Sequence, residues 1–171
     1  MFGASVQAWQ TFYGTIATSA SALVGLLFVA LSLNAAILIR AESAGLRVLA
    51  QQTFSTFVII IGFSLMFLIP DTTPVGLGLP LFCLAVVGLV SSTRAIGPVL
   101  RAKRLWSILR DHVGLKLIGL ICMLILAVII IAAGDAGILY WLVAPMMILL
   151  ISATLHVWSL LVGIQQAVEQ K

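Results

Sequence analysis

Charged side chains are scarce in this sequence, because Asp, Glu, Lys and Arg together make up 8% of its 171 residues. A water-soluble domain carries roughly 25%, so these few charges cannot cover the surface of a soluble protein of this length. Hydrophobic residues account for 63% of the chain instead. The composition therefore excludes a soluble domain and predicts an integral membrane protein.

Acidic, histidine and cysteine residues are fewer still, and their scarcity excludes several functions. The chain has five acidic residues, two histidines and two cysteines. No Asp or Glu lies inside a predicted span, which disfavours proton-coupled or sodium-coupled transport, because such transporters commonly use buried carboxylates. Nucleotide-binding loops, zinc-protease motifs and serine-hydrolase motifs are absent as well. We expect no enzyme activity, no metal site and no cofactor.

Five hydrophobic stretches approach or exceed the ~20 residues that cross a bilayer as a helix. They cover residues 12–39, 53–69, 75–93, 115–133 and 138–163. We therefore predict an all-α membrane protein, a compact bundle of five transmembrane helices that forms a single domain over residues 1–171. Tracts at 70–74 and 134–137 predict tight turns. The second and third stretches are short, and a re-entrant hairpin that leaves three full spans is the alternative.

The positive charges predict how the bundle is oriented. All nine Lys and Arg residues fall on one side of the five spans, whereas the two opposite turns carry only Asp71 and Asp135. The positive-inside rule then places the N-terminus outside and the C-terminus in the cytoplasm. This placement explains the basic isoelectric point, so we expect no nucleic-acid partner. The lack of a targeting segment favours a bacterial inner membrane.

The most basic tract predicts a short amphipathic interfacial helix over residues 98–110. Its apolar side chains recur at helical spacing, and its cations lie largely on other faces: Arg101, Lys103, Arg104 and Arg110. Such a helix lies in the headgroup layer and attracts anionic lipid headgroups at about 1 kcal/mol per basic residue. These cations are candidate contacts for anionic lipid or a partner protein. The alternative is a topology determinant without a ligand.

Small and hydroxyl side chains are concentrated in the first span. One stripe recurs at heptad-like spacing and comprises Gly14, Thr18, Ser21, Gly25 and Ser32. Small residues let two helix backbones approach closely in a membrane. The stripe therefore predicts a helix-packing face, within the chain or between subunits. A polar lining for a water-filled path is the other interpretation.

His156 is the ionisable residue that lies deepest in a predicted span. Ser152, His156 and Ser159 share one face of the fifth helix, and these three form our candidate intramembrane polar site. A lipid-facing imidazole would lose its hydrogen bonds to water at a cost of a few kcal/mol, so we expect this face to point into the bundle. Histidine changes charge near neutral pH, which suggests a proton-sensitive gate. The alternative is a hydrogen-bonded interior histidine without a functional role.

Other polar residues gather at the cytoplasmic ends of the spans. They include Ser32, Asn34, Thr53, Ser55, Thr56, Ser91, Ser92 and Thr93. Together with His156 and Ser159 they suggest an inward-facing vestibule rimmed by arginines. Polar residues near helix ends cost little, however, and the same pattern arises without any cavity.

These features favour a non-catalytic accessory or scaffold subunit of a membrane assembly. It would form a homo-oligomer or bind a membrane partner protein through the first span or the basic tract. The alternative is a subunit of a small oligomeric channel, because one bundle of this size is too thin to enclose a pore. The basic rim and the missing intramembrane acids would then favour anions over cations.

Overall fold

A computed structural model describes residues 2–38, 44–70, 72–99 and 106–169, and side chains over 2–36, 45–70, 72–94 and 114–166. Within these ranges the chain is helical and forms no strand. The elements are α1 (Phe2–Leu33), α2 (Ala35–Leu38), α3 (Ala44–Met66), α4 (Pro74–Val99), α5 (Trp106–Ala133), α6 (Ile138–Trp141) and α7 (Val143–Glu169). Five of them, α1, α3, α4, α5 and α7 preceded by α6, are long and apolar enough to cross a membrane.

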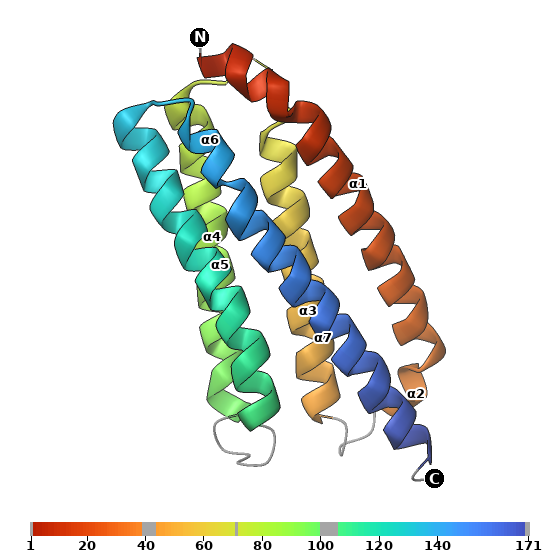
Figure 1. Cartoon of the computed structure of the whole chain (residues 1–171). Coiled ribbons are helices and arrows are strands. Elements are labelled where there is room, and N and C mark those ends of the chain that lie inside the picture. Colours follow the sequence, from red (N-terminus) through yellow and green to blue (C-terminus); the bar gives the residue numbers. More distant parts are fainter. Residues whose placement is uncertain (1, 39–43, 71, 100–105, 170–171) are drawn as a thin grey trace.

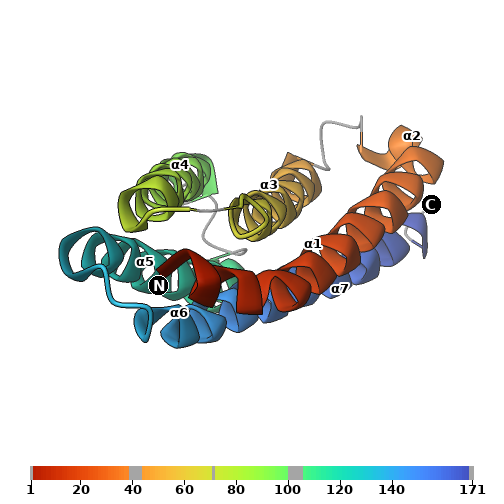
Figure 2. The ribbon, with the colours of Figure 1, turned by 90° about the horizontal axis from the view of Figure 1, so that it is seen from above.

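Four of the long helices form a closed ring, and α1 lies outside it. Helix α3 packs against α4, α4 against α5, α5 against α7, and α7 against α3. Helix α1 packs mainly against α3 (Figures 1 and 2). Its apolar window is 17% buried, against 33–50% for the others. The first helix therefore contributes less to the core than any other span.

The helices are longer than the hydrophobic stretches predicted. Helix α1 begins at Phe2 rather than near Phe12, and α3 begins at Ala44 rather than near Thr53. Polar residues at a span's end continue the helix because each turn satisfies its own backbone groups, which lipid cannot do. Helices α3 and α4 run the length of the bundle (Figure 1), unlike the short arms of a re-entrant hairpin.

The predicted interfacial helix over residues 98–110 is not shown. Its first residues belong to the end of α4, and its last residues belong to the start of α5. Residues 100–105 lie outside the described residues.

Local sequence explains where the helices end. Thr73 Oγ1 accepts a hydrogen bond from the backbone N–H of Gly76 at 3.0 Å, which caps α4, and Pro74 fits the first helical position. Gly134 ends α5 with φ of 61°, a left-handed conformation that glycine adopts without a steric cost. The predicted fifth span is interrupted at Leu142, because Pro145 has no N–H to donate to the carbonyl of Trp141.

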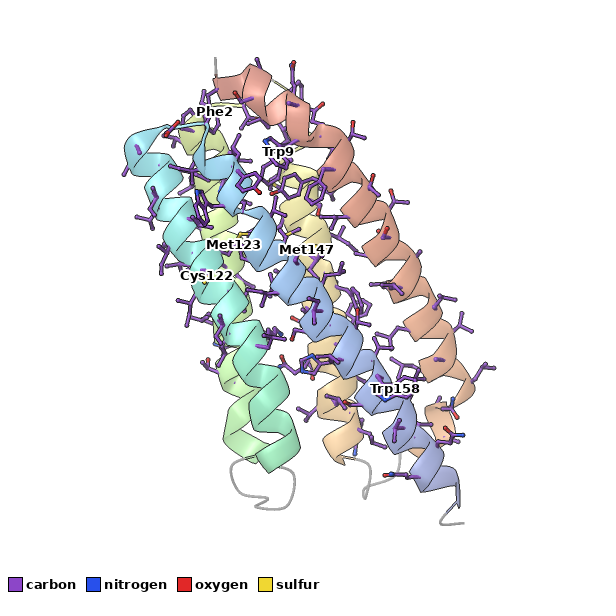
Figure 3. The ribbon with its side chains drawn as sticks, viewed as in Figure 1. Phe2, Trp9, Cys122, Met123, Met147 and Trp158 are labelled. Atoms are coloured by element: carbon purple, nitrogen blue, oxygen red, sulfur yellow. The ribbon has the colours of Figure 1, made fainter. Side chains whose placement is uncertain are left out.

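The two ends of the bundle differ in chemistry. We call the end with Arg47, Arg94 and Lys116 the basic end, and the end with the Asp135 turn the acidic end. Aromatic rings connect α1, the turn after α3, and α6 at the acidic end. The ring centroid of Trp9 lies 6.2 Å from that of Tyr140, and Tyr13 stacks on Phe67 with 3.7 Å between the ring centroids (Trp9 is labelled in Figure 3). Tyr13 is fully buried, so it belongs to the core.

Candidate functional site

Buried polar side chains gather in the half of the ring nearest the basic end. We call this group the polar layer; it comprises Gln52, Thr53, Thr56, Ser92, Lys116, Ser152 and His156. Each member is at most 7% exposed, and all four ring helices contribute. Large apolar side chains, including Phe63, Phe67, Leu77 and Ile130, dominate the other half, where Ser64 and Thr72 are the buried polar residues among those described. The bundle interior therefore becomes richer in polar side chains toward the basic end.

Close contacts at two glycines show that four members of the polar layer lie at one depth. A Cβ on Gly88 would meet Ile59 and Leu120, which places α3, α4 and α5 in register. A Cβ on Gly119 would meet Leu149 of α7. One helical turn nearer the basic end, the same four helices carry Thr56 (α3), Ser92 (α4), Lys116 (α5) and Ser152 (α7). These four residues therefore lie at the same depth.

Lys116 and Gln52 form the central contact of the polar layer. The Lys116 ammonium donates a hydrogen bond to Gln52 Oε1 at 2.8 Å. Gln52 Nε2 donates to the backbone carbonyl of Ser91 at 3.2 Å. One amide side chain of α3 thereby connects α5 to α4. The hydroxyls of Thr53, Thr56 and Ser92 instead donate to carbonyls four residues earlier in their own helices.

The environment of Lys116 is unusual for a lysine. Its side chain is 1% exposed, and burying an ammonium is costly unless it is paired and hydrogen-bonded. Among the residues with described side chains, the acceptor is the neutral amide of Gln52, and no carboxylate pairs with it. Asp135, whose acidic side chain the structure describes, lies at the opposite end of the bundle from Lys116. The positive charge of Lys116 is thus left without an opposite charge from these residues.

His156 lies inside the bundle, in the orientation that its cost in lipid predicts. The residue is 1% exposed, and its Nδ1 lies 2.7 Å from the backbone carbonyl of Ser152. A carbonyl only accepts, so this geometry assigns the proton to Nδ1. The Ser152 hydroxyl lies 3.5 Å from the same nitrogen. Ser159 is half-buried, and its hydroxyl donates to Leu155. A proton-sensing role for His156 stays a prediction.

The small-residue stripe of α1 faces away from the ring. Thr18, Ser21, Gly25 and Ser32 are exposed, and Gly14 is half-buried. A Cβ added at Gly14 or Gly25 would meet nothing within 4 Å. Thr18 and Ser32 satisfy their hydroxyls by donating to carbonyls four residues earlier. Leu27, on another side of the same helix, is 3% exposed and packs in the core.

The sequence alone does not identify two central residues of the polar layer, Gln52 and Lys116. The predicted second span begins at Thr53, which leaves Gln52 in a loop, and the charge pattern uses Lys116 only to orient the bundle. The available signal was the apolar run that follows Lys116 immediately, together with the helical spacing of Gln52 and Thr56. The side chains of Arg101, Lys103, Arg104 and Arg110 lie outside the described ones.

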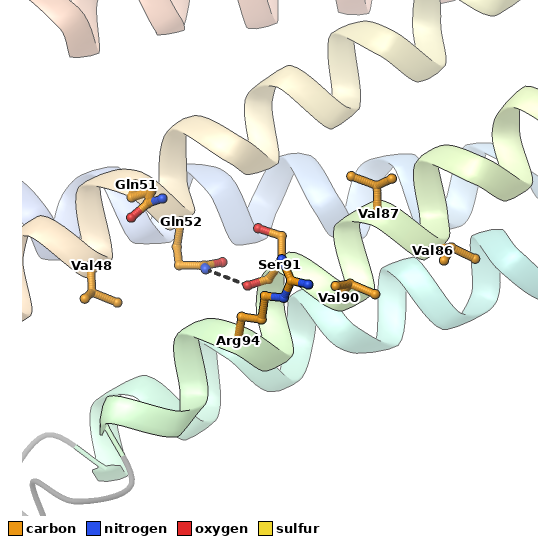
Figure 4. A pocket seen from close by; sticks show the side chains of 8 residues that line it. All are labelled: Val48, Gln51, Gln52, Val86, Val87, Val90, Ser91 and Arg94. Atoms are coloured by element: carbon orange, nitrogen blue, oxygen red, sulfur yellow. Dashed lines mark hydrogen bonds between the residues drawn. The ribbon is translucent and has the colours of Figure 1, made fainter.

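A groove of about 590 Å³ runs between α3 and α4 toward the basic end (Figure 4). Its apolar wall includes Val86, Val87 and Val90, and its polar end includes Gln51, Ser91 and Arg94. Gln52 and Val48 of α3 also line it, so one apolar side chain lies among the polar ones. The amide that binds Lys116 therefore forms part of the groove wall.

Comparison with known proteins finds no matching family model, no matching curated protein and no matching solved structure. The class rests on the fold itself, whose five long apolar helices fit a multi-pass membrane protein.

Proposed function

We propose that this chain is a non-catalytic accessory or scaffold subunit of a membrane assembly, and that it assembles through the outward face of α1. The observation that carries the proposal is the exposed stripe of Thr18, Ser21 and Gly25 on the least buried span. A stripe that packed within the chain would be covered by α3. Because the stripe faces outward, its small residues allow the backbone of a second helix to approach closely.

Gly25→Leu tests this proposal without disturbing the fold of the single chain. The added side chain projects into open space within the chain, so the thermal stability of the isolated subunit should hold or rise slightly, since glycine costs about 1 kcal/mol in a helix interior. We expect the particle mass in mild detergent to fall, because the leucine separates the two backbones. The matched control is Val128→Phe, which adds bulk at an exposed position of α5.

A photo-crosslinking residue at Ser21, introduced in native membranes, identifies the occupant. We expect an adduct with a second copy or with a partner protein, and none from the same residue at Val128. An unchanged mass for Gly25→Leu together with no adduct at Ser21 refutes the proposal.

Orientation is part of the same proposal, with the basic end in the cytoplasm of a bacterial inner membrane. The one-sided placement of Lys and Arg supports it. In a background without Cys83 and Cys122, a cysteine at Gly137 should react with an impermeant thiol reagent added to intact cells. A cysteine at Arg47 should react only after lysis. The reverse pattern inverts the topology.

A channel subunit selective for anions is the second candidate, favoured by the buried cation Lys116 at the basic end. Large apolar side chains fill the other half of the ring, so any continuous path would have to lie between copies, along the α1 hydroxyls. Chloride flux into liposomes, lost in Ser21→Leu, would support this candidate. Flux absent from liposomes that contain the correctly assembled protein would reject it.

A further inference from the structure

The groove between α3 and α4 changes character along its length. Val87 and Val90 are 61% and 42% exposed, so the apolar wall opens onto the outer surface of the bundle. Toward the basic end, Ser91 and Arg94 follow on the same helix and lie opposite Gln52 of α3 (Figure 4). In a bilayer, lipid acyl chains would surround the valines, and lipid headgroups would surround Arg94.

The polar end of the groove is positively charged, and none of the described side chains that line it is acidic. Arg94 is exposed and forms no ion pair with any residue whose side chain the structure describes. Behind the wall, Gln52 accepts the hydrogen bond of the buried Lys116 ammonium. Two cations from different helices thus flank one amide, and an anion held beside Arg94 would offset both charges.

We propose that this groove is a binding site for an anionic phospholipid of the leaflet at the basic end. One acyl chain lies along Val86, Val87 and Val90. The phosphate accepts hydrogen bonds from the Arg94 guanidinium, the Gln51 amide and the Ser91 hydroxyl. Charge complementarity and the exposed apolar wall select this occupant over a zwitterionic lipid, and the site differs from the basic tract at 101–110. It also goes beyond assembly through α1, which lies on other residues.

Native mass spectrometry of the full chain in mild detergent tests the site. The protein is titrated with phosphatidylglycerol and, separately, with phosphatidylcholine of the same chains. We expect tighter binding of phosphatidylglycerol, and Arg94→Gln should weaken it about fivefold, the effect of one basic residue near a charged headgroup. The matched control, Arg47→Gln, removes the same charge from the basic end outside the groove and should leave the affinity near wild type.

A second pair of variants tests the apolar wall independently of charge. Val90→Trp fills the groove and should abolish the tight adduct, whereas Val58→Trp adds the same bulk at an exposed position of α3 outside it. Excess inorganic phosphate should not displace the lipid, because the acyl chain supplies part of the binding.

Equal losses from Arg94→Gln and Arg47→Gln would mean diffuse surface attraction and overturn the proposal. So would displacement by phosphate, which indicates a free-anion site. If the wild type forms no lipid adduct and Val90→Trp changes the oligomer mass, a second copy covers the groove instead.

Discussion

The hydrogen bond between Lys116 and Gln52 makes a sharp prediction about stability. Gln52→Leu removes the amide oxygen that accepts from a 1% exposed ammonium at 2.8 Å. Leaving a buried group without its hydrogen-bond partner costs about 1–3 kcal/mol, and more when the group is charged, as this ammonium is. Lys116→Met removes the ammonium and leaves an amide oxygen without its donor, at about 1–3 kcal/mol. Each single variant is therefore expected to be less stable than the wild type.

The double variant is expected to be more stable than Gln52→Leu alone. With both partners replaced by apolar side chains of similar length, no unpaired charge remains, and the lost contact with the Ser91 carbonyl costs only about 1 kcal/mol. The coupling energy should therefore reach about 2 kcal/mol or more, above the roughly 0.6 kcal/mol average of neutral interhelical hydrogen bonds in membranes.

The assay is equilibrium unfolding of the purified protein in mixed micelles, followed by circular dichroism for all four members of the cycle. Gln51→Leu serves as the control, because Gln51 is the exposed neighbour of Gln52 and should change stability by less than about 0.5 kcal/mol. The reasoning fails if the two single effects simply add in the double variant. Additivity would mean that Lys116 finds equivalent solvation without Gln52.

Three further predictions concern other buried groups. Tyr13→Phe should raise stability by about 1 kcal/mol, because the buried hydroxyl has no hydrogen-bond partner among the described residues; a lower melting temperature would reveal a partner in the assembly. Gly78→Ala should cost about 1–3 kcal/mol, since its Cβ would meet Ile131 Cγ1 at 2.5 Å and the Ala127 carbonyl at 3.1 Å; Gly14→Ala, with open space, is the control. His156→Gln should leave stability within about 1 kcal/mol if Nδ1–H is its main donor to the Ser152 carbonyl, and it should remove any pH dependence of assembly or flux between about pH 5 and 8.

Sequence patterns predicted the class and the number of long helices because both depend on apolar length, which is visible residue by residue. They placed the α3 boundary near Thr53 because hydropathy falls there, although the helix continues to Ala44. They also put the Ser152–His156 face inside the bundle, since one polar face in an apolar helix has a single low-cost orientation.

The pairing of Lys116 with Gln52 was beyond the same reasoning. The two residues are 64 positions apart, and their contact depends on which helices are neighbours in the ring. That neighbourhood is set by small residues such as Gly88 and Gly119, which let specific helices approach. Side-chain periodicity gives the buried face of one helix and does not identify its partner. For the same reason, periodicity did not show whether the small-residue face of α1 packs within the chain or faces outward.

The closed ring has a consequence for the order in which the helices are made. Helix α3 contacts α7, the last long helix of the chain, so the ring closes only after every other span has entered the membrane. When α5 inserts, α3 with Gln52 is already in the membrane, but the side of α5 that packs against α7 is still open. During synthesis the Lys116 ammonium therefore has one hydrogen-bond acceptor and is not yet covered by α7. A chain truncated before α7 should keep four spans and expose this cation, which makes it a substrate for membrane quality control.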